Sequence, residues 1–296
     1  ASCYKTNVRY AVPYLVKPED VTPGEANYYR STCGACAANC GIEVKVREGR
    51  PIKLDGSPDS AISNGGMCAT GQASILSLYD TERLANPLMK GEEVKEWTKL
   101  DGTIKGKLAV LKATNKKVAL ITNSINSPST NSAIAAFTEA FPNVEHVSFD
   151  SVSHSGMLDA NEADFGKRVV PHYLFKNAKA IVSFGADFLG TWLSPVEFQS
   201  QYANHRRPES AGGMSVHVQF ESNLSITGTN ADHRFPMASS KELAHVATLY
   251  NYIAKKLGGT QIPVPSDDEL AANAIEKSAE ILLNNAGKSL VVSGSN

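Results

Sequence analysis

The sequence lacks the features that assign a chain to the most easily recognised classes. No apolar run approaches the roughly 20 residues that a helix needs to cross a bilayer, so we expect no membrane-spanning segment. The 29 Lys and Arg residues nearly balance the 30 Asp and Glu residues, which gives no electrostatic case for binding nucleic acid or an acidic membrane surface. Neither a GxGxxG fingerprint nor a P-loop is present, and the GxSxG and HExxH motifs of hydrolases are also missing.

Both ends of the sequence carry signals that bear on the whole protein. It opens with Ala1 and Ser2 followed by Cys3, with no initiator Met and no signal sequence. Two small residues of this kind precede the cysteine of lipoproteins, so the alternatives for Cys3 are a lipid anchor and a free thiol on a loose chain end. Residues 288–296 resemble a strand and a polar loop with nothing after them to cover the strand edge. We therefore expect this sequence to be the front portion of a longer polypeptide.

The first third of the chain predicts a small β-rich domain over residues 1–95. Residues 1–27 are rich in Pro and irregular in pattern, which suits an extended lead-in. Apolar and polar residues then alternate through 41–57 around a turn at Glu48 and Gly49, and this pattern predicts a β-hairpin. An apolar stripe over 71–88 predicts a helix that ends near Pro87.

From about residue 96 the pattern changes to alternating helices and apolar strands. The predicted strands cover 116–124, 144–149, 178–187, 213–220 and 288–294, with helices near 127–142, 239–257 and 267–285. Strands separated by helices imply right-handed crossovers and a parallel sheet that is covered on both faces. We therefore expect an α/β fold, in which the small β-rich domain is followed by a Rossmann-like parallel-sheet domain over 96–296 that this sequence contains only in part.

Four of the five cysteines form the most informative motif. Cys33, Cys36, Cys40 and Cys68 follow the spacing C-x2-C-x3-C-x27-C. Four thiolates are the ligand set of a [4Fe–4S] cluster, and Gly34 and Gly41 allow the backbone to wrap closely around one. A zinc site usually pairs two C-x2-C knuckles, of which only the first is present. Disulfides among three cysteines so close in sequence would be strained. Zinc and disulfides stay open as alternatives to the cluster.

Several stretches carry a resemblance to a known family. The cysteine pattern, "VREGRPIKLDGSP", "NGGMCATGQAS" and "LYDTERLANPL" resemble the N-terminal cluster domain of the molybdopterin oxidoreductases. Further on, "FGADFLGTWLSPVEF" and "SNLSITGTNADHRFPM" resemble the molybdoenzyme-like large subunit of bacterial alternative complex III, a quinol-oxidising membrane complex. The resemblance covers nearly the whole chain and implies the molybdopterin-oxidoreductase fold, although that domain is incomplete here.

The resemblance also implies a cofactor, partners and a location. Cys33, Cys36, Cys40 and Cys68 would bind one [4Fe–4S] cluster, which an isolated fragment can lose. The partners would be a ferredoxin-like iron–sulfur subunit or domain and membrane subunits that interact with quinol. The complex would lie on the periplasmic side of the cytoplasmic membrane. We therefore expect an iron–sulfur electron-transfer or scaffold subunit of an exported respiratory complex.

One departure from the family pattern bears on molybdenum. Working members commonly carry Lys or Arg two positions after the fourth cysteine, between cluster and pterin, whereas this chain has Thr70. Thr cannot supply the positive charge that would favour an anionic pterin. Since members of the alternative complex III branch also lack the molybdenum cofactor, we do not expect molybdopterin here. The alternatives are an active molybdopterin-dependent oxidoreductase and a cofactor-free structural module.

Three strand ends are candidates for holding part of a cofactor. In an open α/β sheet, ligands bind beyond the carboxyl ends of the strands. Asn123 and Ser124 end one predicted strand, Gly185 and Asp187 end another, and Ser293 and Asn296 end a third. Together with Thr70, these residues lie in the region that holds part of the pterin dinucleotide in molybdoenzymes. The alternative is that they form ordinary strand-to-helix loops.

Overall fold

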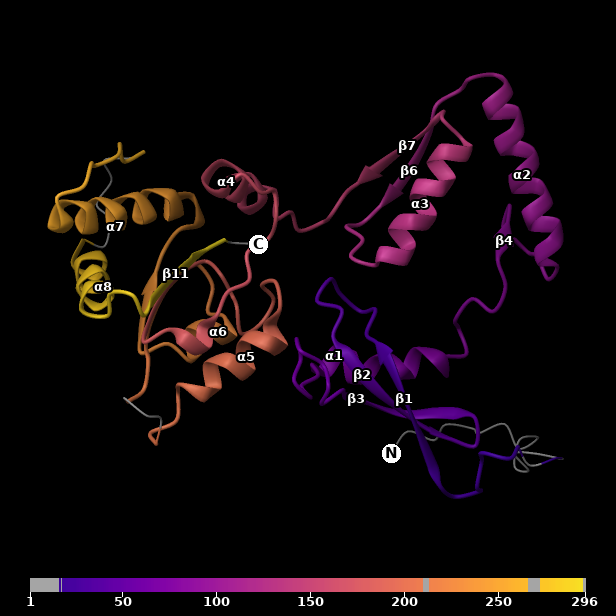
Figure 1. Cartoon of the computed structure of the whole chain (residues 1–296), viewed down its shortest axis with the longest axis horizontal. Helices are drawn as coiled ribbons and strands as arrows, with labels where there is room; N and C mark the ends of the chain where they lie inside the picture. Colours follow the sequence, from indigo (N-terminus) through magenta and orange to yellow (C-terminus); the bar gives the residue numbers. More distant parts are fainter. Residues whose placement is uncertain (1–15, 17, 210–212, 266–271, 295–296) are drawn as a thin grey trace. The chain divides into compact units, whose positions relative to one another are not determined.

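The computed structural model describes the chain in several stretches, and Cys3 and Asn296 lie outside them. The residues described are 16, 18–209, 213–265 and 272–294. The chain divides into two compact units, Ala1–Glu93 and Val94–Asn296 (Figure 1). No helix in the described part of the chain combines the length and apolar character that crossing a membrane would require.

The first unit is built on a three-stranded antiparallel sheet in the order β1-β2-β3. Its strands are β1 (Ala26–Thr32), β2 (Gly41–Arg47) and β3 (Arg50–Gly56). Glu48 and Gly49 both have positive φ, of 46° and 75°, as a tight two-residue hairpin turn requires. The predicted hairpin is therefore confirmed. β1 was not predicted, because its residues are mostly polar and exposed and show no apolar alternation.

The predicted helix over 71–88 is wrong in its second half. The structure has a short helix α1 (Ala69–Ala73), a 3-10 helix η2 (Ser74–Leu78), and then turns. The Asp80 side chain accepts a hydrogen bond from the Glu82 amide at 2.9 Å, a local contact that competes with helix continuation. Two short strands, β4 (Leu88–Met89) and β5 (Glu92–Glu93), close the unit.

The second unit begins with a two-stranded parallel sheet. Helix α2 (Trp97–Ala113) precedes β6 (Val118–Thr122), and α3 (Pro128–Ala140) connects β6 to β7 (Val144–Ser148) (Figure 1). Ser127 caps α3, with its hydroxyl accepting a hydrogen bond from the Thr130 amide at 3.3 Å, and Pro128 occupies the first helical position. The helix predicted over 127–142 is confirmed.

A four-stranded parallel sheet follows in the same unit, in the order β10-β9-β8-β11. Its strands are β8 (Ala180–Phe184), β9 (Val216–Glu221), β10 (His233–Pro236) and β11 (Ser289–Ser293). The helices around it are α4 (Ser155–Phe165), η3 (Phe175–Asn177), α5 (Pro195–Asn204), α6 (Ile226–Thr229), η4 (Ser239–Lys241), α7 (Glu242–Leu257) and α8 (Ala272–Asn284).

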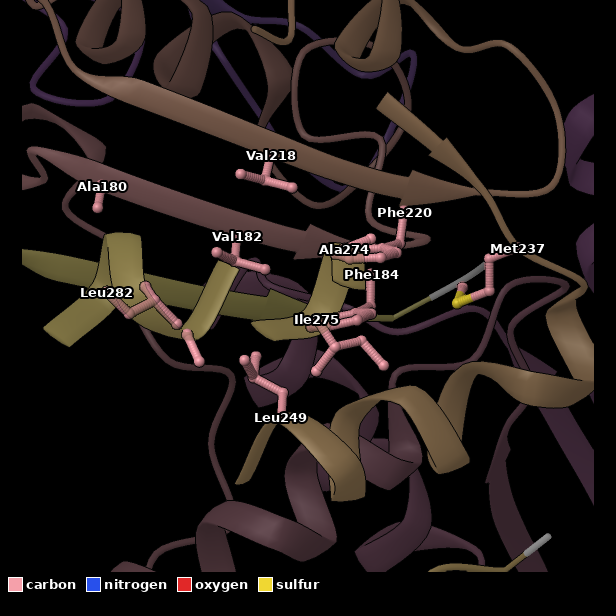
Figure 2. Packing of buried hydrophobic residues seen from close by; sticks show 11 residues of the cluster. Ala180, Val182, Phe184, Val218, Phe220, Met237, Leu249, Ala274, Ile275 and Leu282 are labelled. Carbon is pink, nitrogen blue, oxygen red and sulfur yellow. The ribbon is translucent and has the colours of Figure 1, made fainter. Parts of the chain in front are cut away.

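Helices cover both faces of the four-stranded sheet. On one face, Val182 and Phe184 of β8 pack with Leu249 of α7 and Ile275 of α8 (Figure 2). On the other face, Ile181 belongs to a second cluster that includes residues of η3 and α5. All five residues of β8 are buried, which explains why this segment reads as a continuous apolar run. The prediction of an α/β fold with a parallel sheet covered on both faces is confirmed.

The pairing of the strands differs from the prediction. The five predicted strands belong to two separate sheets, with β6 and β7 in one and β8, β9 and β11 in the other, and β10 adds a strand that was not predicted. Apolar periodicity identifies a strand from its own residues. It carries no information on which distant strand becomes the neighbour, so the assignment to one sheet was wrong.

Candidate metal centre

Three of the four motif cysteines lie on the loop between β1 and β2. Cys33 directly follows β1 and Cys40 directly precedes β2, and the Cys33 amide donates a hydrogen bond to the Cys40 carbonyl oxygen at 2.8 Å. Both residues are buried. Cys36 lies at the exposed tip, where Asn39 adopts a positive φ of 47° and its amide donates to the Cys36 carbonyl oxygen at 3.3 Å. The end of the hairpin sheet thus fixes the spacing of these three thiols.

The fourth cysteine reaches the same region through the segment after β3. The Ser57 amide donates to the Gly41 carbonyl oxygen at 2.9 Å, and the Ser63 hydroxyl contacts the same oxygen at 3.3 Å. These bonds fold the segment back onto the start of β2. Cys68 then caps α1, because its Sγ accepts a hydrogen bond from the Gly71 amide at 3.3 Å.

A glycine keeps α1 close to the buried thiol of the first loop. A Cβ placed on Gly71 would lie 3.6 Å from the Sγ of Cys33 and only 2.8 Å from the Cε of Met67. A side chain at this position would therefore displace the end of Met67 and touch the Cys33 sulfur at an ordinary contact distance. The first turn of the helix that Cys68 caps thus lies next to the Cys33 thiol.

The other three motif cysteines influence the ionisation of Cys40. All four are free. The pKa of the Cys40 thiol is raised, first by burial and then by the proximity of Cys36, Cys33 and Cys68. Mutual repulsion of this kind requires the sulfur atoms to lie near one another. The structure therefore brings together the four residues that the sequence singled out.

This set of donors fits an iron–sulfur cluster. Within the described residues, no three His, Cys, Asp or Glu side chains are gathered as the ligands of one metal ion. Four thiolates are the ligand set that a four-iron cluster takes, one at each iron. The raised pKa of Cys40 means that this buried thiol resists ionisation, and a cationic iron centre would favour its thiolate.

Thr70 lies in the first turn of α1, two residues after Cys68, and its side chain is exposed. The position two residues after the fourth cysteine therefore carries no positive charge.

Asn123 and Ser124 follow β6, and Ser124 ties the end of that strand to Asp150, which follows β7. The Ser124 amide and hydroxyl donate to the two carboxylate oxygens of Asp150, at 2.8 and 2.5 Å. These bonds lower the pKa of the Asp150 carboxyl. The carbonyl oxygen of Asn123 accepts a hydrogen bond from the Thr122 hydroxyl at 2.8 Å. The side chain of Ser124 is therefore engaged in holding the ends of β6 and β7 together.

Gly185 and Asp187 follow β8 and lie in the loop that leads to α5. Gly185 has a positive φ of 64°, and its amide donates to the Phe220 carbonyl oxygen at 2.8 Å. Asp187 Oδ1 accepts hydrogen bonds from the amide and the hydroxyl of Thr227, at 3.2 and 2.7 Å. Because β6 and β8 belong to different sheets, the strand end at Asn123 and Ser124 does not share a sheet edge with the one at Gly185 and Asp187. Ser293 ends β11, which pairs with β8 in parallel, so these two predicted strand ends do lie at one edge.

Residues that the sequence did not single out complete this region. Glu221 ends β9, is 4% exposed and binds Nε of Arg234 at 2.5 Å. It also accepts hydrogen bonds from the amide and hydroxyl of Ser225, at 3.3 and 2.5 Å. The position of a charged residue, Glu221, at the end of an apolar strand could be seen in the sequence. Its partners Arg234 and Ser225 could not be identified from the sequence pattern.

Comparison with known proteins gives the class of the first unit. Residues 26–80 match the family model of the molybdopterin oxidoreductase Fe4S4 domain. This stretch holds the whole three-stranded sheet and all four cysteines of the site. The unit is therefore an iron–sulfur domain of the kind found in molybdopterin oxidoreductases.

Similarity to whole proteins extends beyond that domain. The chain is 34% identical over 113 residues to a sulfite dehydrogenase subunit of Allochromatium vinosum, which covers 35% of this chain and 12% of that protein. It is 23% identical over 270 residues to the molybdopterin-binding-like subunit of menaquinone reductase from Nitratidesulfovibrio vulgaris, which covers 87% of this chain and 37% of that protein. The chain thus spans well under half the length of these relatives.

A solved structure shows the same fold. Acetylene hydratase from Pelobacter acetylenicus superposes with a TM-score of 0.62 at 12% identity, over 88% of this chain and 39% of that one. This likeness shows the fold, while the matched Fe4S4 domain and the relatives above support the molybdopterin oxidoreductase superfamily.

Proposed function

We propose that this chain is an iron–sulfur electron-transfer and scaffold subunit of a respiratory redox complex, in which Cys33, Cys36, Cys40 and Cys68 hold one [4Fe–4S] cluster. The observation that carries the proposal is the presence of four free cysteines inside a matched Fe4S4 domain, three of which affect the pKa of the buried Cys40 thiol. A cluster bound there supplies one-electron transfer.

The protein's own groups would set the properties of that centre. Burial of Cys33 and Cys40 keeps water from one side and lowers the local dielectric constant, which disfavours added negative charge. The Gly71 amide points at the sulfur of Cys68 at 3.3 Å and would stabilise negative charge on it, which raises the reduction potential. The exposed Cys36 and Cys68 mark the side on which an electron partner would approach.

Anaerobic reconstitution with iron and sulfide, followed by iron analysis and EPR of the reduced protein, tests the proposal. We expect about four irons per chain and a cluster signal, and a quadruple Cys→Ser variant should lose both. The matched control is Cys3→Ser, which removes the one cysteine outside the matched domain and should leave the iron content unchanged. Colourless protein with no iron-dependent signal would favour a cofactor-free structural module instead.

The wider setting is part of the same proposal. We infer that the complex is exported and lies on the periplasmic side of the cytoplasmic membrane, beside a ferredoxin-like iron–sulfur partner and quinol-interacting membrane subunits. Support comes from the sequence stretches that resemble alternative complex III and from the similarity to a menaquinone reductase subunit. Cell fractionation and co-purification of the full-length protein test it, and recovery of a free cytosolic protein would refute it.

An active molybdopterin oxidoreductase is the second candidate, because relatives such as the arsenate respiratory reductase subunit of Shewanella sp. are molybdopterin-containing. Metal and pterin analysis of the full-length protein separates the two. Molybdenum or tungsten at one atom per protein would establish the second candidate.

A further inference from the structure

The carboxyl edge of the four-stranded sheet is where an α/β fold of this kind binds phosphate-bearing ligands. Backbone amides in the loops after the strands, and in the first turn of the following helix, normally supply the hydrogen bonds to the anion. In this chain those amides belong to the loop after β8 and to the segment from the end of β9 into α6. The acceptors of these amides therefore decide whether an anion can bind here.

Three amides around the start of α6, those of Ser225, Thr227 and Gly228, donate to the chain's own oxygen atoms. The Ser225 amide donates to Glu221 Oε1 at 3.3 Å, and the Thr227 amide donates to Asp187 Oδ1 at 3.2 Å. The Gly228 amide donates to the hydroxyl of Ser225 at 2.9 Å. Two carboxylates thus occupy the position at which a phosphate would meet this helix.

The loop after β8 is closed in the same way. The Leu189 amide donates to the hydroxyl of Thr227 at 2.9 Å. Three successive amides converge on the carbonyl oxygen of Asp187, from Gly190 and Thr191 at 2.9 Å and from Trp192 at 3.0 Å. Asp187 therefore binds this loop with its main chain and α6 with its side chain.

Two glycines make room for these carboxylates. A Cβ on Gly190 would lie 2.0 Å from Asp187 Oδ2, and a Cβ on Gly228 would lie 1.9 Å from Glu221 Oε1. Both distances are far below van der Waals contact. The backbone is thus built around the two carboxylates, as a phosphate-binding loop is built around its ligand.

A third carboxylate stands at the end of β11. Glu242 Oε1 accepts hydrogen bonds from the Ser293 hydroxyl at 2.8 Å and from the Gly294 amide at 3.2 Å. An acidic side chain therefore lies at the end of each of β8, β9 and β11, supplied at β11 by Glu242 of α7, and accepts hydrogen bonds from nearby backbone or hydroxyl groups. An incoming phosphate would find these donors taken and negative charge already in place.

We propose that Asp187, Glu221 and Glu242 act as built-in anions, which take the place of phosphate groups at the carboxyl edge of this sheet, so that the edge binds no phosphate-bearing cofactor. The inference goes beyond the proposed electron-transfer function and is independent of it, because it concerns the second unit and not the cysteine site. Iron content reports on the first proposal, whereas anion binding reports on this one.

The direct test is titration of the full chain with GDP and with inorganic pyrophosphate, monitored by thermal unfolding and by calorimetry. A ligand that binds the folded state raises the midpoint temperature. We expect no saturable heat and a midpoint that moves by less than about 1 °C at millimolar ligand. Saturable binding of either compound at this edge, lost in Thr227→Val, would overturn the proposal.

A rescue experiment tests the role of Asp187. Asp187→Ala removes the acceptor of the Thr227 amide and hydroxyl, so we expect a lower midpoint that sodium acetate or pyrophosphate partly restores, relative to sodium chloride of equal ionic strength. Asp159→Ala, which removes an exposed carboxylate paired with Arg168, should show no such rescue. If Asp187→Ala folds but neither acetate nor pyrophosphate raises its midpoint temperature, the proposal is contradicted. If this variant does not fold, the titration of the unmodified chain is the deciding test.

Discussion

A buried histidine makes the second unit sensitive to acid. His217 lies in β9 and is fully buried; its Nδ1 is 3.2 Å from the Tyr202 hydroxyl and its Nε2 is 3.3 Å from Oε1 of Gln219. Burial, and then the nearby Arg206 guanidinium, lower the pKa of His217 from 6.5 to about 4. The folded protein therefore holds this imidazole neutral at pH values where the unfolded chain protonates it.

The sign and size of the effect follow from this difference. Between pH 6.5 and pH 4 the unfolded state binds one more proton than the folded state, so the free energy of unfolding falls as the pH is lowered. A difference of 2.5 units between 6.5 and about 4 corresponds to about 3 kcal/mol at 1.36 kcal/mol per unit. The contribution of His217 to the free energy of unfolding is therefore fully present above pH 6.5, and most of it is lost by pH 4.

Urea unfolding at pH 7.5 and at pH 4.5 measures the effect in the unmodified chain and in His217→Gln. We expect the variant to be less stable at pH 7.5, because it loses aromatic packing against Phe188, but to lose about 2–3 kcal/mol less than the unmodified chain between the two pH values. The same pH dependence in both proteins would refute the reasoning. So would an NMR titration of the His217 ring with a midpoint near 6.5.

Three further outcomes follow from close contacts in the second unit. Gly190→Ala and Gly228→Ala should each lower the free energy of unfolding by roughly 1–3 kcal/mol, because the new Cβ would meet a carboxylate oxygen at 2.0 or 1.9 Å. Arg206→Met should cost about 1–3 kcal/mol in urea unfolding, since it removes a two-pronged contact of 2.7 and 2.9 Å with Asp232 and leaves that carboxylate without its cation.

Matched controls separate these contacts from general effects of substitution. Gly156→Ala places a Cβ in open space within α4 and should stabilise the protein by roughly 0.5–1 kcal/mol through helix propensity. Arg168→Met breaks an exposed ion pair with Asp159, and its effect should stay within about 1 kcal/mol. If the controls match the losses at Gly190 and Arg206, the proposed contacts are not the cause.

Local patterns in the sequence predicted local structure well. The turn at Glu48 and Gly49, the Ser127 cap of α3 and the apolar run of β8 were each visible within a few neighbouring residues. The cysteine motif was also readable, because its meaning depends on residue type and spacing. The structure adds that Cys33 and Cys40 are buried and that the other three cysteines help to raise the pKa of Cys40.

What the sequence could not reveal depends on contacts between distant residues. Asp187 and Thr227 are 40 positions apart, and no periodicity relates them. The division of the parallel strands between two sheets, and the addition of β10, are likewise decided by packing between elements. For the same reason Asp187 was predicted as a cofactor residue, while its hydrogen bonds to Thr227 emerge only in the folded chain.

Cys68 has two roles whose combination affects how the first unit matures. Its sulfur caps α1, a helix of only five residues, which is too short to be stable by itself. A metal-bound thiolate accepts the Gly71 hydrogen bond more strongly than a neutral thiol does. Loading of iron should therefore also stabilise α1. The last step of cofactor assembly would then also be the last step in the folding of this unit. Hydrogen exchange of the Gly71 amide should slow when iron is bound.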